Sequence, residues 1–189
     1  MTATQPIRDK KELKRFTEYY LKKGQLRNYT LIVMGIYTAL RVSDLLRLRW
    51  DDVYDFENKR FRTHIILKER KTGKSKAIAL NKSVKAALER ALPHKRGIFI
   101  FAGNRKNVAP ISRIQAYRIV KAAADAVKAV TRISCHSLRK TLGYHAWRAG
   151  AAVAVIMDIY NHSSYEVTRR YLGITQDDRD KVYLDIVLM

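Results

Sequence analysis

The segment "CHSLRKT", residues 135–141, places one cysteine, one histidine, two basic side chains and two hydroxyls within seven positions. Taken alone, this segment is compatible with four interpretations. It could hold a Cys–His nucleophile, contribute to a metal site, form the solvated start of a helix, or form half of a phosphate-binding clamp. Residues at fixed distances elsewhere in the chain decide among them.

The composition of the chain indicates a folded intracellular protein. Its 189 residues are 47% apolar and include three prolines, which suits one large domain or two small ones with a real core. A single cysteine excludes an internal disulfide and fits a reducing cytoplasm. The N-terminus shows no signal peptide, and the longest apolar run, "LIVMGIYTAL" (31–40), is about half of a membrane span. We therefore expect a cytoplasmic protein with no membrane partner.

The charge of the chain points to a polyanionic partner. Thirty-eight Lys and Arg residues stand against 17 Asp and Glu residues, which gives a formal net charge of +21. Such an excess favours a polyanion because each phosphate that is neutralised releases condensed counterions. The basic residues are spread along the chain and interleaved with 11 tyrosines, so nucleic acid is favoured over an anionic lipid surface or a merely soluble basic protein.

Helical periodicity dominates the chain. The first helix begins with Asp9 and Glu12 at capping-box spacing and ends at Gly24. Ser43 or a neighbour is expected to cap the third helix, and Ser163 with Glu166 forms a second capping box. The expected helices cover residues 8–24, 28–40, 43–50, 83–92, 112–130, 136–150, 152–160, 163–171 and 175–189.

The period changes to two between the third and fourth helices, which indicates strands. Apolar and polar residues alternate over 61–68, and "SKAIAL" (75–80) reads as a second strand. The intervening "ERKTGK" (69–74) holds the glycine that a tight hairpin favours, and 51–60 supplies another short strand and a turn. The prediction is a single, mainly α domain over 1–189 with a small antiparallel β-sheet. Residues 1–8 form a short N-terminal extension and 176–189 a C-terminal tail helix.

Within the opening segment, His136 and Arg139 are three residues apart near a helix start, so they share a face. The free N–H groups and positive end of that helix also favour a phosphate. Cys135 is adjacent to His136 and points elsewhere on a helix, which disfavours a Cys–His nucleophile. The five histidines lack the short paired spacings of a zinc site, so we expect no metal and no cofactor.

Four distant segments complete the pattern. An arginine lies in "TALRVSDL" (38–45), a lysine in the hairpin "KTGK" (71–74), a histidine in "YNH" (160–162), and a tyrosine nine residues after that histidine. With H-S-L-R (136–139), these segments resemble the tyrosine recombinase, or phage integrase, family. The matches occur in family order across residues 38–171. They are Arg41, Lys71, His136, Arg139, His162 and Tyr171.

The resemblance implies the DNA breaking-rejoining fold of the tyrosine recombinase catalytic domain and a site-specific recombinase or integrase activity. Tyr171 would attack a DNA phosphodiester and form a 3′-phosphotyrosyl link. That link keeps the bond energy, so religation needs no high-energy cofactor. Arg41 and Arg139 would bind the phosphoryl oxygens bidentately, as planar guanidinium groups can.

Proton transfer completes the implied mechanism. A free tyrosine has a pKa of about 10, so the nucleophile needs a base or a strongly positive site. His136 is the candidate base, Lys71 would protonate the leaving 5′ oxygen, and His162 would donate to a phosphoryl oxygen. Competing residues remain for two of these roles. They are Lys68, Lys74 and Lys76 for the lysine, and Tyr160, Tyr165 and Tyr183 for the tyrosine.

The chain departs from the family pattern in two respects that matter here. Only a handful of residues precede the catalytic-type domain, where the family usually carries an N-terminal DNA-gripping domain. The usual Gly before the later histidine is replaced by Asn161, the non-glycine residue type that best tolerates a left-handed backbone.

The implied partners are double-stranded DNA, further copies of the chain on DNA through the C-terminal helix, and accessory recombination proteins. The alternative function is a non-catalytic DNA-binding regulator or a helper of a full-length recombinase. The missing N-terminal domain favours this alternative, whereas an intact set of six site residues argues against it.

Overall fold

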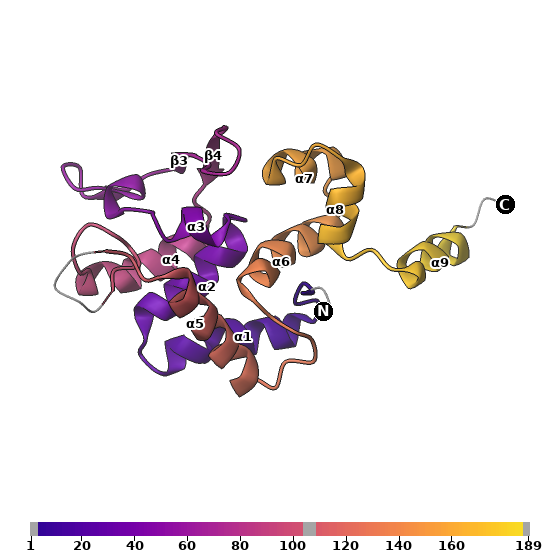
Figure 1. Ribbon diagram of the computed structural model, residues 1–189, viewed down its shortest axis with the longest axis horizontal. Helices are drawn as coiled ribbons and strands as arrows, with labels where there is room; N and C mark the ends of the chain where they lie inside the picture. The colour runs from indigo at the N-terminus through magenta and orange to yellow at the C-terminus, as the bar shows by residue number, and fades with distance from the viewer. Residues whose placement is uncertain (1–3, 104–108, 187–189) are drawn as a thin grey trace.

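The computed structural model describes residues 4–103 and 109–186, and it is mainly helical with small antiparallel sheets, as expected (Figure 1). None of the described helices is long and apolar enough to cross a membrane. The helices are α1 (Lys10–Lys22), α2 (Leu26–Tyr37), α3 (Val42–Leu45), α4 (Lys82–Ala91), α5 (Arg113–Ala126), α6 (Cys135–Arg148), α7 (Val153–Tyr160), α8 (Tyr165–Leu172) and α9 (Gln176–Asp185), with 3₁₀ turns η1 (Trp50–Asp52) and η2 (Leu92–His94).

Capping residues fix several helix ends. The Asp9 carboxylate accepts a hydrogen bond from the Glu12 amide at 2.6 Å, and Gly24 adopts a φ of +65° after α1, as predicted. The capping box is incomplete, because Oε1 of Glu12 has no hydrogen-bond partner among the described residues. The predicted cap of α8 was one residue early. Ser164, not Ser163, has the extended backbone of an N-cap, and its hydroxyl accepts from the Val167 amide.

The predicted sheet is divided into two hairpins. Strand β1 (Tyr54–Asp55) pairs with β2 (Arg60–Phe61), and β3 (His64–Lys68) pairs with β4 (Ser75–Ala79). The expected continuous strand over 61–68 is broken because Arg62 turns back toward β1: its amide donates to the Val53 carbonyl and its Nε to the Asp51 carbonyl. The predicted turn between β3 and β4 is closed by a bond from the Glu69 amide to the Lys74 carbonyl.

Other boundaries were also predicted too generously. The third helix covers Val42–Leu45 rather than 43–50, and the backbone of Arg41 occupies its N-cap position. Residues 48–50 leave the helix because their backbone pairs with 98–100: the Ile100 amide donates to Leu48 and the Trp50 amide to Ile98. Helix α5 ends at Ala126 rather than 130, and α9 ends at Asp185; the last predicted helical residues, 187–189, lie outside the described part of the chain.

Helix α2 occupies the centre of the molecule and contacts α1, α4 and α6 (Figure 1). Every residue from Thr30 to Ile36 is buried, as expected for a helix surrounded by others. Gly35 allows the close approach of α6, since a Cβ there would lie 2.7 Å from Cδ1 of Leu138. This packing holds the C-terminal end of α2 near the beginning of α6, where the site residues gather.

The predicted N-terminal extension packs against this core in its described part. Ile7 is buried, and its amide donates to the Thr141 hydroxyl of α6 at 3.0 Å. Arg8 donates to the Gly173 carbonyl that follows α8. Residues 4–9 therefore contact both α6, which carries the segment 135–141, and the end of α8, which carries Tyr171.

Candidate active site

One cavity of about 1040 Å³ brings the predicted site residues together. It lies where the α2–α3 turn, the β3–β4 hairpin, the start of α6 and helix α8 meet. Its lining includes all six predicted positions, which come from segments up to 130 residues apart. They are Arg41, Lys71, His136, Arg139, His162 and Tyr171.

The two arginines differ in their surroundings. Arg41 is partly exposed, and its Nη1 lies 2.8 Å from Oε2 of Glu69. Arg139 is 1% exposed; its Nη1 donates to the Ala39 carbonyl and its Nη2 to the Tyr160 carbonyl at 2.8 Å. Within the described residues, Nε of Arg139 has no hydrogen-bond partner. Leaving a buried, charged donor without a partner is costly, and Arg139 is also part of the cavity lining.

Glu69 was not among the predicted site residues, yet it connects most of the site's elements. Its carboxylate accepts from Arg41 at 2.8 Å, from Thr72 at 2.9 Å and from Asn161 at 2.9 Å. Burial alone would raise its pKa, but these hydrogen bonds and the charge of Arg41 hold the pKa at about 2. Glu69 is therefore ionised at neutral pH and joins the hairpin to α3 and to the α7–α8 junction.

Two hairpin lysines lie near the site in different states. Lys71 is exposed at the hairpin turn and lines the cavity. Lys76 is largely buried; its Nζ donates to the Ile159 carbonyl and lies 3.8 Å from Oε1 of Glu69. Burial, followed by the charge of Arg139, lowers the pKa of Lys76 to about 8. Lys71 thus lines the cavity, whereas the buried Lys76 contacts Glu69 and the Ile159 carbonyl.

Both site histidines are neutral at pH 7. Desolvation and the charges of Lys140, Arg139 and Arg41 lower the pKa of His136 to about 4. Desolvation, Arg139 and Arg41 lower the pKa of His162 to about 4 as well. His162 Nδ1 lies 3.0 Å from the Thr168 hydroxyl, which also donates to the Ser164 carbonyl at 3.4 Å.

Tyr171 lies between the two histidines. Its ring centroid is 4.4 Å from that of His162 and 4.9 Å from that of His136, both in edge-to-face contact. The competing Tyr160 is fully buried, and its hydroxyl donates to the Arg139 carbonyl at 2.6 Å. Tyr165 is 48% exposed on the same helix and is not part of the cavity lining. Of these three tyrosines, Tyr171 is the one that lines the cavity.

Cys135 lines the same cavity but is poorly suited to act as a nucleophile. Burial raises the pKa of its thiol to about 11, so the thiolate is scarce at neutral pH. The Cys–His interpretation of the opening segment therefore fails on the protonation state of the cysteine.

Comparison with known proteins shows to which family the chain belongs. The model of the phage integrase family matches residues 8–177. The chain belongs to this family. It is 39% identical over 184 residues to the probable integrase/recombinase YoeC of Bacillus subtilis, with 97% of each chain covered. It is 31% identical to the type 1 fimbriae regulatory protein FimE of Escherichia coli, covering 77% of this chain and 73% of FimE.

A solved structure extends the comparison to the fold. The post-cleavage complex of the XerH site-specific recombinase with palindromic difH substrate superposes with a TM-score of 0.76 at 18% identity. The match covers 97% of this chain and 53% of the XerH chain. The chain therefore shares the fold of a tyrosine recombinase catalytic domain and spans about half the length of XerH.

Some features of this phage integrase site carried a sequence signal and others did not. Asn161 was expected to tolerate a left-handed backbone, and its φ of 53° confirms this. Ala39 also adopts a positive φ of 52°, and its carbonyl accepts from Arg139, but nothing in an alanine predicts that conformation. Glu69 stands within "KERKTGK", where an acidic residue among basic ones reads as an ordinary solvated turn.

Proposed function

We propose that this phage integrase family member is a site-specific DNA recombinase that cleaves and rejoins DNA through a 3′-phosphotyrosyl link on Tyr171. The observation that carries the proposal is that all six predicted residues line one cavity in which a buried arginine Nε lacks a described partner. The neutral histidines and the proximity of Tyr171 to both of them also support it.

In the proposed reaction, the scissile phosphate binds between Arg41 and Arg139. Their guanidinium groups stabilise the charge that develops on the phosphoryl oxygens, and the His162 ring donates to one of them. Glu69 holds Nη1 of Arg41 in place, and Arg41 also lines the cavity. Preorganised donors of this kind require no reorganisation during the reaction.

The proton transfers follow from the states of the site residues. The Tyr171 oxygen forms a bond to phosphorus as its proton passes to neutral His136, and the bond from phosphorus to the 5′ oxygen breaks. Lys71, which faces the cavity, protonates the leaving 5′ oxygen. Rejoining is the reverse: a 5′-hydroxyl attacks the phosphotyrosine, Tyr171 leaves, and both protons return.

We further propose that the substrate is double-stranded DNA and that the protein acts in the cytoplasm, where such DNA would be found. The net charge of +21 suits this partner. A second, basic cavity of about 850 Å³ adjoins the first, and Tyr171 and His136 line both. XerH, with the same fold, is bound to DNA in its solved complex. The basic side chains of the adjoining cavity are Arg8, Lys140, Arg169, Arg170 and Arg179.

The second partner that we propose is a further copy of this chain, bound through α9 on the same DNA. Figure 1 shows α9 standing away from the other helices at the C-terminal end. Tyr183 and Leu184 are each 81% exposed, and Val182 is also exposed. Exposed apolar side chains on one helix favour burial against another chain, here a second copy bound to the same DNA. Accessory recombination proteins would then act on this assembly of protein and DNA.

A nicked-duplex trapping experiment tests the proposed function. A nick near the cleaved phosphate lets the released fragment diffuse away, so religation fails and the covalent intermediate accumulates. The wild-type protein should form an SDS-resistant adduct with DNA in the absence of magnesium, and Tyr171→Phe should form none. Tyr165→Phe, on the same helix but outside the cavity lining, should behave as wild type. DNA binding without any adduct would instead favour the non-catalytic regulator.

A further inference from the structure

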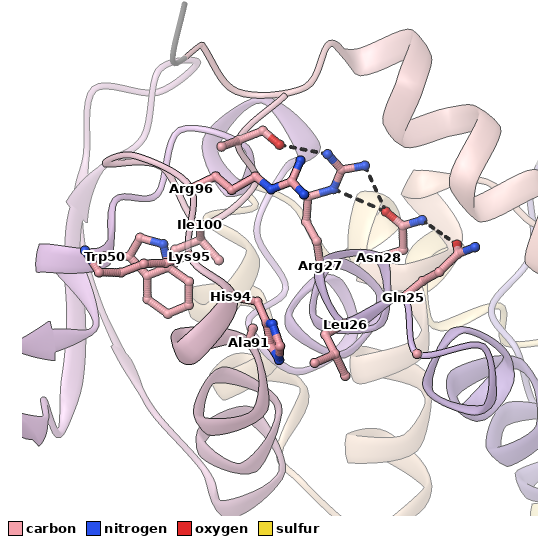
Figure 2. A pocket seen from close by; sticks show the side chains of 12 residues that line it. Gln25, Leu26, Arg27, Asn28, Trp50, Ala91, His94, Lys95, Arg96 and Ile100 are labelled. Carbon is pink, nitrogen blue, oxygen red and sulfur yellow. Dashed lines mark hydrogen bonds between the residues drawn. The ribbon is translucent and has the colours of Figure 1, made fainter. Parts of the chain in front are cut away.

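A separate cavity of about 480 Å³ lies at the opposite end of α2 from the candidate active site (Figure 2). The 12 residues of α2 span about 18 Å, so the cavity is well removed from Tyr171. Among the described residues, its lining contains three cationic side chains and no acidic one. The residues are Gly24, Gln25, Leu26, Arg27, Asn28, Trp50, Ala91, His94, Lys95, Arg96, Ile100 and Ala102.

Two arginines concentrate the charge of this cavity. Nη1 of Arg27 donates to the Ala102 carbonyl at 2.8 Å, and its Nε and Nη2 lie 3.4 and 3.3 Å from Oδ1 of Asn28. These contacts hold the Arg27 guanidinium group beside that of Arg96, as Figure 2 shows. Partial burial and the charge of Arg96 lower the pKa of Arg27. Two like charges held together, with no carboxylate among the described lining residues, attract an anion.

The end of α2 adds to this positive field. Gln25 occupies the N-cap position but its side chain makes no capping hydrogen bond, and the first turn of α2 contains no acidic residue. The partial positive charge of a helix N-terminus therefore meets the cavity without compensation from the helix itself. A bound anion would supply both the cap and the counter-charge.

Trp50 provides an independent sign of a missing partner. The residue is 3% exposed and its side chain lines the cavity, yet among the described residues Nε1 has no hydrogen-bond acceptor. An indole N–H is a donor only, and a buried donor without an acceptor is costly. A buried neutral donor without a described acceptor thus belongs to a residue of the cavity wall, in addition to the two guanidinium groups.

We propose that this cavity, between the N-terminus of α2 and residues 94–102, is a second phosphate-binding site. The phosphate belongs either to a free phosphate-bearing molecule or to the DNA backbone at a distance from the cleaved bond. Arg96 binds its oxygens, and the charge of Arg27 and the end of α2 stabilise it. The proposal does not depend on the recombinase activity, because none of these residues contributes to the candidate active site.

The tryptophans offer a local reporter for the test. The chain contains two, Trp50 and Trp147, so the NMR spectrum of ¹⁵N-labelled protein contains two indole N–H signals, which Trp147→Phe assigns. Inorganic phosphate replaces chloride at constant ionic strength and pH 7. We expect the Trp50 signal to shift in a saturable manner. A Trp50 signal that does not respond to phosphate would overturn the proposal.

Two neighbouring variants separate a specific site from general charge. Arg96→Gln removes an exposed guanidinium group that faces Arg27, and we expect it to weaken phosphate binding roughly tenfold. Lys95→Gln removes the same charge one residue away, where Nζ lies over the Phe56 ring at 5.1 Å, and should change the affinity less than about twofold. Equal weakening by both variants would contradict a built site.

A third arm of the experiment identifies the source of the phosphate. A short DNA duplex is added to the wild-type protein, and the Trp50 signal is followed again. If the duplex shifts this signal and blocks the further effect of inorganic phosphate, the DNA backbone occupies the cavity. If the duplex binds without affecting the signal and phosphate still titrates, the ligand is a free phosphate-bearing molecule.

Discussion

At the scale of single residues, Glu69 is the side chain on which the geometry of the candidate site most depends. It is 1% exposed, and its carboxylate contacts Arg41, Thr72 and Asn161, while Arg139 lies 4.0 Å from Oε1. Removing the charge leaves several buried cations without compensation. We predict that Glu69→Gln lowers the free energy of unfolding at pH 7 by roughly 3 kcal/mol and slows DNA cleavage, because Arg41 loses its fixed position.

The pH dependence of this effect follows from the pKa of Glu69. The folded value is about 2 against an ordinary value of 4.5, so the ionised carboxylate stabilises the fold above about pH 4.5. This contribution is lost as the pH falls from 4.5 toward 2. Chemical denaturation should therefore show wild type and Glu69→Gln converging at low pH. Glu57→Gln, at an exposed turn residue, is the matched control; equal stability of wild type and Glu69→Gln at pH 7 would refute the role.

A second residue-scale prediction concerns the proposed base. Its depressed pKa means that His136 is neutral in the free protein well below the ordinary value of 6.5. NMR titration of the histidine ring protons should give a pKa of about 4 for both His136 and His162. Since Lys140 is the largest charge effect on His136, Lys140→Gln should raise the pKa of His136 and move that of His162 less.

The observation that would contradict this account is a titration of His136 at or above 6.5 in the free protein. The base would then be protonated over much of the neutral range and unable to accept the Tyr171 proton. The neutral His136 affects the free energy of unfolding in the same direction as the ionised Glu69. It stabilises the fold above the pKa of the unfolded state, and this contribution is lost as the pH falls from 6.5 toward 4.

At the scale of elements, the packing of α6 against α7 positions Arg139. The Tyr160 hydroxyl of α7 donates to the Arg139 carbonyl, and the Gly143 amide donates to that hydroxyl at 2.7 Å. A Cβ at Gly143 would lie 2.8 Å from Cε2 of Tyr160. We predict that Gly143→Ala destabilises the protein by about 1–3 kcal/mol, as overpacking does, despite the better helix propensity of alanine. Chemical denaturation measures the change.

A double variant provides the control for this contact. In Gly143→Ala/Tyr160→Phe, the hydroxyl nearest to the new methyl group is absent, so the two substitutions should destabilise less than the sum of their separate effects. Strict additivity, or an alanine variant more stable than wild type, would show that the approach of α7 does not require the glycine.

The elements themselves were largely predictable from local signals. Capping residues, glycine stops and the change of hydrophobic period located the helices and the β3–β4 hairpin. The errors arose where distant segments intervened. The third helix was predicted too long because residues 48–50 bond to 98–100, and the strand over 61–68 was predicted unbroken because Arg62 bonds back to Val53. Neither partner can be read from the local sequence.

At the scale of the whole molecule, the exposed α9 raises a prediction about assembly. Replacing Tyr183 and Leu184 by serine should leave the stability of the single chain unchanged, since both side chains are exposed. On a DNA carrying two binding sites, sedimentation should show fewer protomers bound together than with wild type. Val130→Ser, at an exposed apolar residue outside α9, is the control. Unchanged assembly of the α9 variant would refute the proposed role of this helix.

The residues of the candidate site were more predictable than the residues that hold them in place. Arg41, Lys71, His136, Arg139, His162 and Tyr171 were recognisable because each belongs to a short motif in a fixed order, and they line one cavity. Glu69 and Ala39 were missed because their roles exist only after folding, when segments about 30 to 100 residues apart meet. The cavity at the start of α2 carries no motif, so only the fold reveals it.

The most direct test of the central claim is to identify the amino acid that carries the DNA. The adduct trapped on the nicked duplex is digested with protease and nuclease, and the peptide that retains a nucleotide is sequenced by mass spectrometry. The account predicts a nucleotide joined through its 3′-phosphate to Tyr171. A nucleotide on Tyr165, Tyr183 or Cys135, or one joined through its 5′-phosphate, would contradict it.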